Sequence, residues 1–90
     1  MPYMGGSAFA MARDVGEGYV LLNATTLKRM TGEELRQLRF EVERILTGIR
    51  GEAPPLDDVQ ALSARNRKIA RLNSAVLMIN NHVQMNRMRL

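Results

Sequence analysis

The stretch MTGEELRQLRFEVERILTGIR, from Met30 to Arg50, decides the fold because it holds both a helix start and a helical apolar period. Thr31 can accept a hydrogen bond from the N–H of Glu34, whose carboxylate can reach back to the N–H of Thr31. Met30 and Leu35 flank this capping box at the spacing of a hydrophobic staple. The sequence therefore predicts that a helix begins here.

Apolar side chains recur along this helix at alternating spacings of three and four residues. They are Leu35, Leu38, Val42, Ile45 and Ile49. This period is typical of a helix that packs against another helix along a narrow seam. Gly51 and the pair Pro54-Pro55 then end the pattern. We predict a first helix over residues 31–50 and a loop over residues 51–56.

A second, longer helix is predicted over residues 57–88. No glycine or proline occurs from residue 56 to 90, and Asp57 and Asp58 stand where the positive end of a helix dipole favours acidic groups. In a heptad register its seam consists of Leu62, Ile69, Leu72, Val76, Ile79 and Val83. Because the loop is short, the two helices are expected to fold back as an antiparallel helical hairpin.

The N-terminal third shows weaker patterns. Residues 1–18 contain four of the seven glycines and have no strand or helix period, which predicts a flexible tail. Residues 19–30 are predicted to form a short arm, in which Tyr19–Leu22 is extended or a short strand. The predicted domain, residues 19–90, is all-α.

Three asparagines, Asn66, Asn73 and Asn80, border the seam of the second helix at one heptad position. Asparagine is a mediocre helix former, so its repetition needs a reason. One reading is a partly solvated border whose amides face water. The other is a partly buried interface in which the amides pair across subunits, or with the backbone of a partner, and fix the register.

A difference in helix length suggests an exposed apolar surface. Residues beyond roughly Val76 are expected to extend past the shorter first helix, with Met78 and Met85 on the outer side. Such a surface needs a cover. The cover could be Tyr19–Leu22 with Leu27, the same region of a second chain, or another protein.

Dimerisation is the solution that the sequence favours. A two-helix hairpin buries a single seam, which is little for a chain of this size, so we expect a homodimer arranged as a four-helix bundle. The predicted interface residues are Asn73, Met78, Asn80 and Met85. An unidentified protein partner is the other expected occupant of this surface.

Composition argues against catalysis and membrane insertion. The chain has no cysteine, and its one histidine, His82, has no Asp or Glu within two helical turns, so neither a metal site nor a catalytic triad can form locally. We predict no enzymatic activity, no cofactor and no small-molecule substrate. No apolar run is long enough to span a bilayer and no export signal is visible, so a cytoplasmic location is expected.

A basic cluster on the second helix supports an alternative function. The formal net charge is +4, and residues 53–90 carry six Lys or Arg against Asp57 and Asp58. The candidate anion-binding residues, Arg65, Arg67, Lys68 and Arg71, lie within two helical turns. Such a cluster can hold phosphates of RNA or DNA. No aromatic residue interleaves it, and no helix-turn-helix spacing appears.

One family resemblance bears on this alternative. The run from Leu27 to Leu35, followed by Arg67-Lys68-Ile69-Ala70-Arg71-Leu72, is similar to the small two-helix hairpin protein of the large ribosomal subunit. The resemblance implies a capped helix, a short loop and a basic helix that contacts ribosomal RNA. The Pro54-Pro55 loop, the asparagine border and the methionines depart from that pattern, so the resemblance is one of shape and is not taken as identity.

The sequence thus predicts a non-enzymatic, small helical module for protein–protein interaction, assembly or regulation. It is expected to homo-oligomerise through its long C-terminal helix, with nucleic-acid binding by the basic face of that helix as the alternative.

Overall fold

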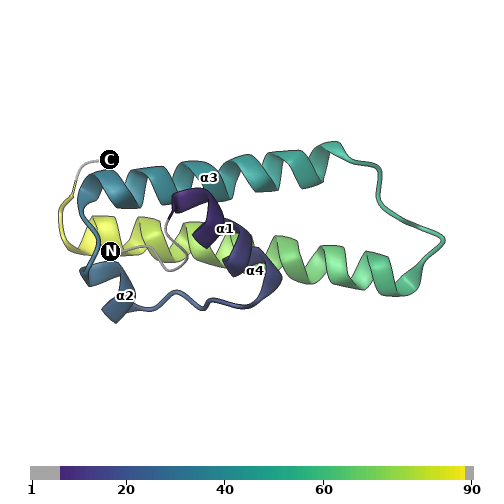
Figure 1. Ribbon diagram of the computed structural model, residues 1–90, viewed down its shortest axis with the longest axis horizontal. Coiled ribbons are helices and arrows are strands. Elements are labelled where there is room, and N and C mark those ends of the chain that lie inside the picture. The colour runs from purple at the N-terminus through teal and green to yellow at the C-terminus, as the bar shows by residue number, and fades with distance from the viewer. Residues whose placement is uncertain (1–6, 89–90) are drawn as a thin grey trace.

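The computed structural model describes residues 7–88 and shows an all-α protein, as predicted. Its four helices within these residues are α1 (Ala8–Glu17), α2 (Ala24–Lys28), α3 (Gly32–Gly51) and α4 (Val59–Met85). The two long helices, α3 and α4, lie side by side and run in opposite directions, joined by residues 52–58 (Figure 1). Helix α1 packs against both of them, and α2 lies beside α4 (Figure 1).

Helix α3 begins with the capping box that the sequence predicts. The Thr31 hydroxyl accepts from the N–H of Glu34 at 3.2 Å, and the Glu34 carboxylate accepts from the N–H of Thr31 at 2.8 Å. These two bonds satisfy backbone donors that a helix start leaves without partners. The helix continues to Gly51, one residue beyond the predicted end, and Glu52 leaves it in an extended conformation.

Helix α4 is shorter than predicted at both ends. The carboxylate of Asp58 accepts from the N–H of Ala61 at 3.0 Å, so Asp58 is the cap and the helix begins at Val59. The helix ends at Met85, where the following residue, Asn86, is the C-cap. The loop is therefore residues 52–58, two residues longer at its C-terminal end than expected.

The N-terminal prediction differs from the structure. The sequence predicts a flexible tail over residues 1–18, yet Ala8–Glu17 form α1; residues 1–6 lie outside the described part of the chain. The Ser7 hydroxyl caps α1 by accepting from the N–H of Ala10 at 3.0 Å, and Gly18 ends it with a φ of 84°. The buried residues of α1 are Met11, Ala12, Val15 and Gly16. Two of these four are small residues that contribute little to a hydropathy pattern, which explains why the sequence shows no clear period here.

The part of the arm that follows α1, residues 19–23, lies in neither a helix nor a strand. Tyr19 and Leu21 are exposed, whereas Leu22 is buried in the common core. Asn23 then caps the short helix α2, its side chain accepting from the N–H of Thr26 at 2.9 Å. The arm carries Leu27 and Met30 into the core, so the arm packs on its own chain.

The predicted seam is mostly correct in position and only partly buried. Leu35, Leu38 and Val42 of α3 are fully buried, as are Leu72 and Ile79 of α4. The other predicted seam residues, Ile45, Ile49, Leu62, Ile69, Val76 and Val83, are half-buried. Leu46 of α3 and Ala75 of α4 are buried instead, because α1 covers a wider stripe of both helices than a two-helix seam would need.

The expected apolar overhang is absent. Asn80 accepts a hydrogen bond from Arg39 of α3 at 2.9 Å, so α4 still lies beside α3 well beyond Val76. The prediction was wrong because it assumed that the end of α3 and the start of α4 lie side by side at the loop. The first turn of α4 lies at the loop end of the molecule instead, where Leu56 and Val59 are exposed.

Two glycines in helices provide a matched test of this packing. Gly48 of α3 has nothing within 4 Å of the position that a Cβ would take, so Gly48→Ala should raise the free energy of unfolding by about 0.5–1 kcal/mol through helix propensity. At Gly16 of α1 a Cβ would lie 3.3 Å from Cδ2 of Leu72, so Gly16→Ala should stabilise less or destabilise. Urea unfolding followed by circular dichroism measures both; a larger gain at Gly16 would contradict the packing of α1.

Candidate interaction surfaces of the fourth helix

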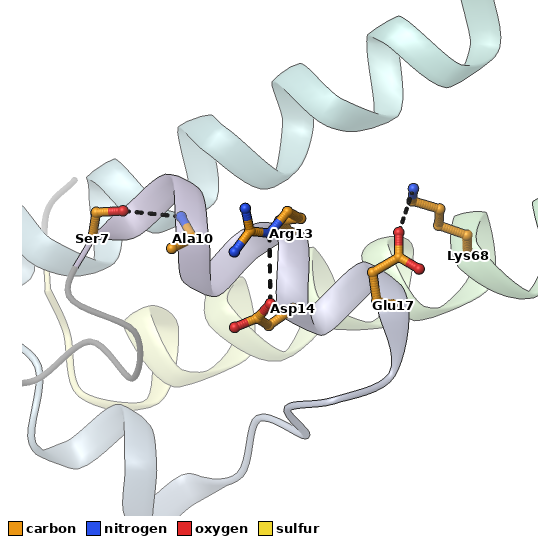
Figure 2. A network of polar contacts seen from close by, with 6 residues as sticks. All are labelled: Ser7, Ala10, Arg13, Asp14, Glu17 and Lys68. Atoms are coloured by element: carbon orange, nitrogen blue, oxygen red, sulfur yellow. Dashed lines mark hydrogen bonds and ion pairs between the residues drawn. The ribbon is translucent and has the colours of Figure 1, made fainter.

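An ion pair joins the first half of α4 to the end of α1. Nζ of Lys68 donates to Oε1 of Glu17 at 2.9 Å, and the two side chains approach each other from the two helices (Figure 2). The hydrogen bond from Lys68, followed by the attraction of its charge, holds the pKa of the Glu17 carboxyl below its usual value. Lys68 is therefore engaged within the chain.

Arg71 binds the backbone at the same end of α1. Its Nη1 donates to the carbonyl oxygen of Gly16 at 3.1 Å. The last carbonyls of a helix lack partners within the helix and carry partial negative charge, so a guanidinium group stabilises them. Gly18 leaves room for this group, because a Cβ there would lie 3.1 Å from Cζ of Arg71.

Arg65 has a similar role at the end of α3. Its Nη2 donates to the carbonyl oxygen of Ile49 at 3.3 Å, while its Nε is buried without a hydrogen-bond partner. Arg67 differs from the other three cations: within residues 7–88 its hydrogen bond is to Ser63 of its own helix, from Nη1 to Oγ at 3.4 Å. Among the four, Arg67 is the cation that the packing uses least.

The structure does bring the four predicted cations together. Arg65, Arg67, Lys68 and Arg71 line one open groove of about 600 Å³, which lies between the ends of α1 and α3 and the first half of α4. Glu17 and Glu52 line the same groove and offset part of its charge. The four cations therefore do lie together, but Arg65, Lys68 and Arg71 each bind a neighbouring helix.

Two of the asparagines bind arginines of α3 within the same chain. Oδ1 of Asn73 accepts from Nη2 of Arg50 at 3.0 Å, and Oδ1 of Asn80 accepts from Nη1 of Arg39 at 2.9 Å. Asn66, Asn73 and Asn80 are all exposed, which agrees with the reading of a solvated border, and the hydrogen bonds of Asn73 and Asn80 to α3 are an addition that neither reading included. The asparagine border therefore holds α3 and α4 together, and these contacts place Asn73 and Asn80 toward α3.

The two predicted methionines differ in exposure. Met78 is half-buried and lines two apolar grooves: one, of about 470 Å³, with Leu21 and Leu22, and one, of about 440 Å³, with Leu27 and Met85. The arm thus lies along this side of α4. Met85 itself is 83% exposed.

A further surface of α4 is one that the sequence reasoning missed. The exposed residues Ala70, Ser74, Leu77, Asn81 and Gln84 recur at spacings of four and three, which places them on one side of the helix, away from the buried Leu72 and Ile79. We call this set the outer face. No Asp, Glu, Lys or Arg occurs between Arg71 and Arg87, and that gap in charge is the signal that could have revealed it.

Sites for metal ions or for membrane insertion are not seen in the described residues. Within residues 7–88, no group of three or more His, Asp or Glu side chains could hold a metal ion. In the same part of the chain, no helix is both long and apolar enough to cross a bilayer. Comparison of the chain with protein families, with curated proteins and with solved structures finds no match.

The ion pair of Lys68 with Glu17 predicts a pH dependence of stability. Because folding lowers the pKa of Glu17, the ion pair contributes stability above the unfolded-state pKa, near 4.5, and loses it as the pH falls through the lower folded-state value. Glu17→Gln should therefore destabilise the protein at pH 7, by less than about 1 kcal/mol because the pair is partly exposed, and this effect should shrink as the pH is lowered below 4.5.

Urea unfolding at several pH values checks this expectation, and Lys68→Met provides the control background. In that background, the pH-dependent effect of Glu17→Gln on the free energy of unfolding should shrink strongly. An equal effect in both backgrounds would show that Lys68 is not its source.

Proposed function

We propose that the protein is a non-enzymatic interaction and assembly module that homo-oligomerises through α4. The observation that carries the proposal is the outer face: an exposed helix surface of about four turns, without any charged residue, in a chain with 24% charged residues. Solvated helix surfaces normally carry charged side chains. The cores of protein interfaces, by contrast, are depleted in charge.

Exposed apolar side chains on and beside the outer face support the same proposal. Leu77 is 63% exposed on the outer face, and Met85 borders it at the next position after Gln84. Leu21 of the arm is 84% exposed and lines a groove together with Ala70 and Ser74. Apolar surface that is grouped in this way marks an interaction site better than the same residues scattered singly.

The proposal shifts the interface around α4 from where the sequence analysis put it. Asn73 and Asn80 bind α3, so their role is to hold the protomer together, and Met78 packs partly beneath the arm. Met85 keeps its proposed interface role. Ala70, Leu77 and Asn81 replace Asn73 and Asn80 as proposed interface residues.

Leu77→Asp tests this function because it places a charge in the middle of the outer face. Sedimentation equilibrium should show an oligomer for the parent chain and a monomer, or a self-association weakened by at least tenfold, for Leu77→Asp. Phe40→Asp is the matched control: Phe40 is 62% exposed on α3, so the same substitution should leave the mass unchanged. A monomeric parent chain, or equal effects of the two substitutions, would count against the proposal.

Nucleic-acid binding is the second candidate, favoured by the groove that brings four cations together. Phosphates could bind there, since an arginine that donates one hydrogen bond to a carbonyl keeps further donors. The engagement of Arg65, Lys68 and Arg71 with neighbouring helices also explains why those positions are basic without any nucleic acid. We therefore rank this function second.

Arg67→Glu separates the two candidates, because the hydrogen bond of Arg67 in the described residues lies within its own helix and its replacement should leave the fold intact. If the groove binds RNA, a labelled single-stranded oligonucleotide should bind the parent chain at low salt and bind Arg67→Glu several-fold more weakly. Arg44→Glu, on α3 and outside the groove, changes the net charge equally and should have a smaller effect. Absence of RNA binding by the parent chain would eliminate this candidate.

A further inference from the structure

We propose that Met78, His82 and Met85 of α4 form a binding site for a soft monovalent metal ion such as Cu(I). The site goes beyond the proposed function, because it lies within one protomer and needs no second copy. It follows from the position of the three side chains in one groove, from their spacing along the helix and from the chemistry of their donor atoms.

One groove brings the three side chains together. Met78, His82 and Met85 line the groove of about 440 Å³ between α4 and α2, whose wall on α2 includes Ala24 and Leu27. Met78 and His82 are half-buried, while Met85 is 83% exposed. A metal ion can therefore reach Met85 from solvent and meet the other two side chains farther inside the groove.

The spacing of the three residues is one that helical metal ligands use. Met78 and His82 are four residues apart, and His82 and Met85 are three residues apart. Paired ligands in helical zinc and di-iron sites have these same intervals. At 3.6 residues per turn and 1.5 Å per residue, the three positions lie within about 60° of arc and about 10 Å of helix. Because helical side chains lean toward the N-terminus, Met85 leans toward His82, and His82 leans toward Met78.

The donor atoms select a soft metal ion. Thioether sulfur is a soft ligand that favours Cu(I), whereas Mg²⁺ and Ca²⁺ prefer oxygen, and Zn²⁺ prefers thiolate, imidazole and carboxylate. Among the described residues, no Asp or Glu lines this groove, and no group of three His, Asp or Glu could hold a metal ion. The three donors are neutral, so a monovalent ion leaves less net charge in the groove than a divalent ion does.

Two other residues of the groove affect metal binding by His82. Lys28 carries a charge that opposes a cation, but its side chain is exposed and can keep its ammonium group in water. Nδ1 of His82 lies 3.4 Å from Nδ2 of Asn86, which leaves Nε2 as the ring nitrogen for the metal. Nδ1 then carries the ring proton, and the Asn86 amide can accept a hydrogen bond from it by turning its oxygen toward the ring.

Titration of the full chain with Ag(I) tests the site, because Ag(I) is a soft monovalent ion that needs no reductant. Calorimetry in a nitrate buffer should show one Ag(I) per chain, bound more tightly than by free methionine. In methyl NMR spectra of the same titration, the signals of Met78 and Met85 should shift, while those of the buried Met11 and Met30 should stay in place. Cu(I), added with ascorbate in the absence of oxygen, should shift the same two signals.

Substitutions identify the ligands. Leucine nearly keeps the volume of methionine and removes its sulfur, so the fold and its circular dichroism should be kept. Met78→Leu, Met85→Leu and His82→Gln should each lower the affinity for Ag(I) about tenfold or more, since even residues behind a metal ligand are typically worth that much. Met88→Leu is the matched control and should leave the affinity unchanged, because Met88 follows the end of α4 and is not among the residues that line the groove.

Each of three other outcomes would overturn the site. An affinity for Ag(I) no higher than that of free methionine would show that the three side chains do not act together. Equal losses in Met78→Leu and Met88→Leu would show that scattered sulfur atoms bind the ion. An undiminished affinity in the double variant with Met78→Leu and Met85→Leu would place the ion elsewhere in the chain.

Discussion

The close approach of α1 to α4 at Gly16 and Leu72 is the contact on which the rest of the structure depends. Leu72 is fully buried, and a Cβ on Gly16 would lie only 3.3 Å from its Cδ2. A pair of helices alone buries one seam, which seldom suffices for a chain of this length. Helix α1 supplies the third packing element, and it can do so because Gly16 lets its backbone come close to Leu72.

Polar contacts surround this apolar contact and explain the basic cluster: Lys68 and Arg71 bind the end of α1, and Arg65 binds the end of α3. The first half of α4 is therefore basic where the C-terminal ends of α1 and α3 lie against it, whereas its second half lies beside α2 and the first half of α3 and carries no charged residue up to Arg87.

The sequence allowed prediction of those parts of the fold that local chemistry determines. The α3 start followed from Thr31 and Glu34, and the all-α class followed from helical periods and missing breakers. Helix α1 was not predicted because its buried side includes Ala12 and Gly16, which are small and add little to a hydropathy pattern. The close approach of Leu72 to Gly16 shows why a small residue is needed there, and the sequence does not show that contact. The apolar overhang was wrong for a related reason: where two helices start relative to each other depends on the loop, which helix lengths do not specify.

The candidate surfaces divide in the same way. The four cations were correctly grouped, because residues within two helical turns stay together whatever the fold. Their engagement with α1 could not be foreseen without α1, and neither could the pairing of the asparagines with Arg39 and Arg50, which depends on how α3 faces α4. The gap in charge between Arg71 and Arg87 was visible in the sequence. Only the exposure of Leu77 turned it into a candidate interface.

The choice of asparagine at positions 73 and 80 links the protomer to its proposed assembly. Each amide accepts from an arginine, and a carboxylate in its place would make a stronger, charge-assisted bond to the same guanidinium. Folding alone would therefore favour aspartate or glutamate there. A carboxylate there would form an ion pair with the arginine, and both charges of a pair at the edge of a closed seam lose water on assembly at a cost in free energy. Asparagine binds Arg39 and Arg50 without adding a second charge, so fewer charges would lose water if the outer face closed in the proposed assembly.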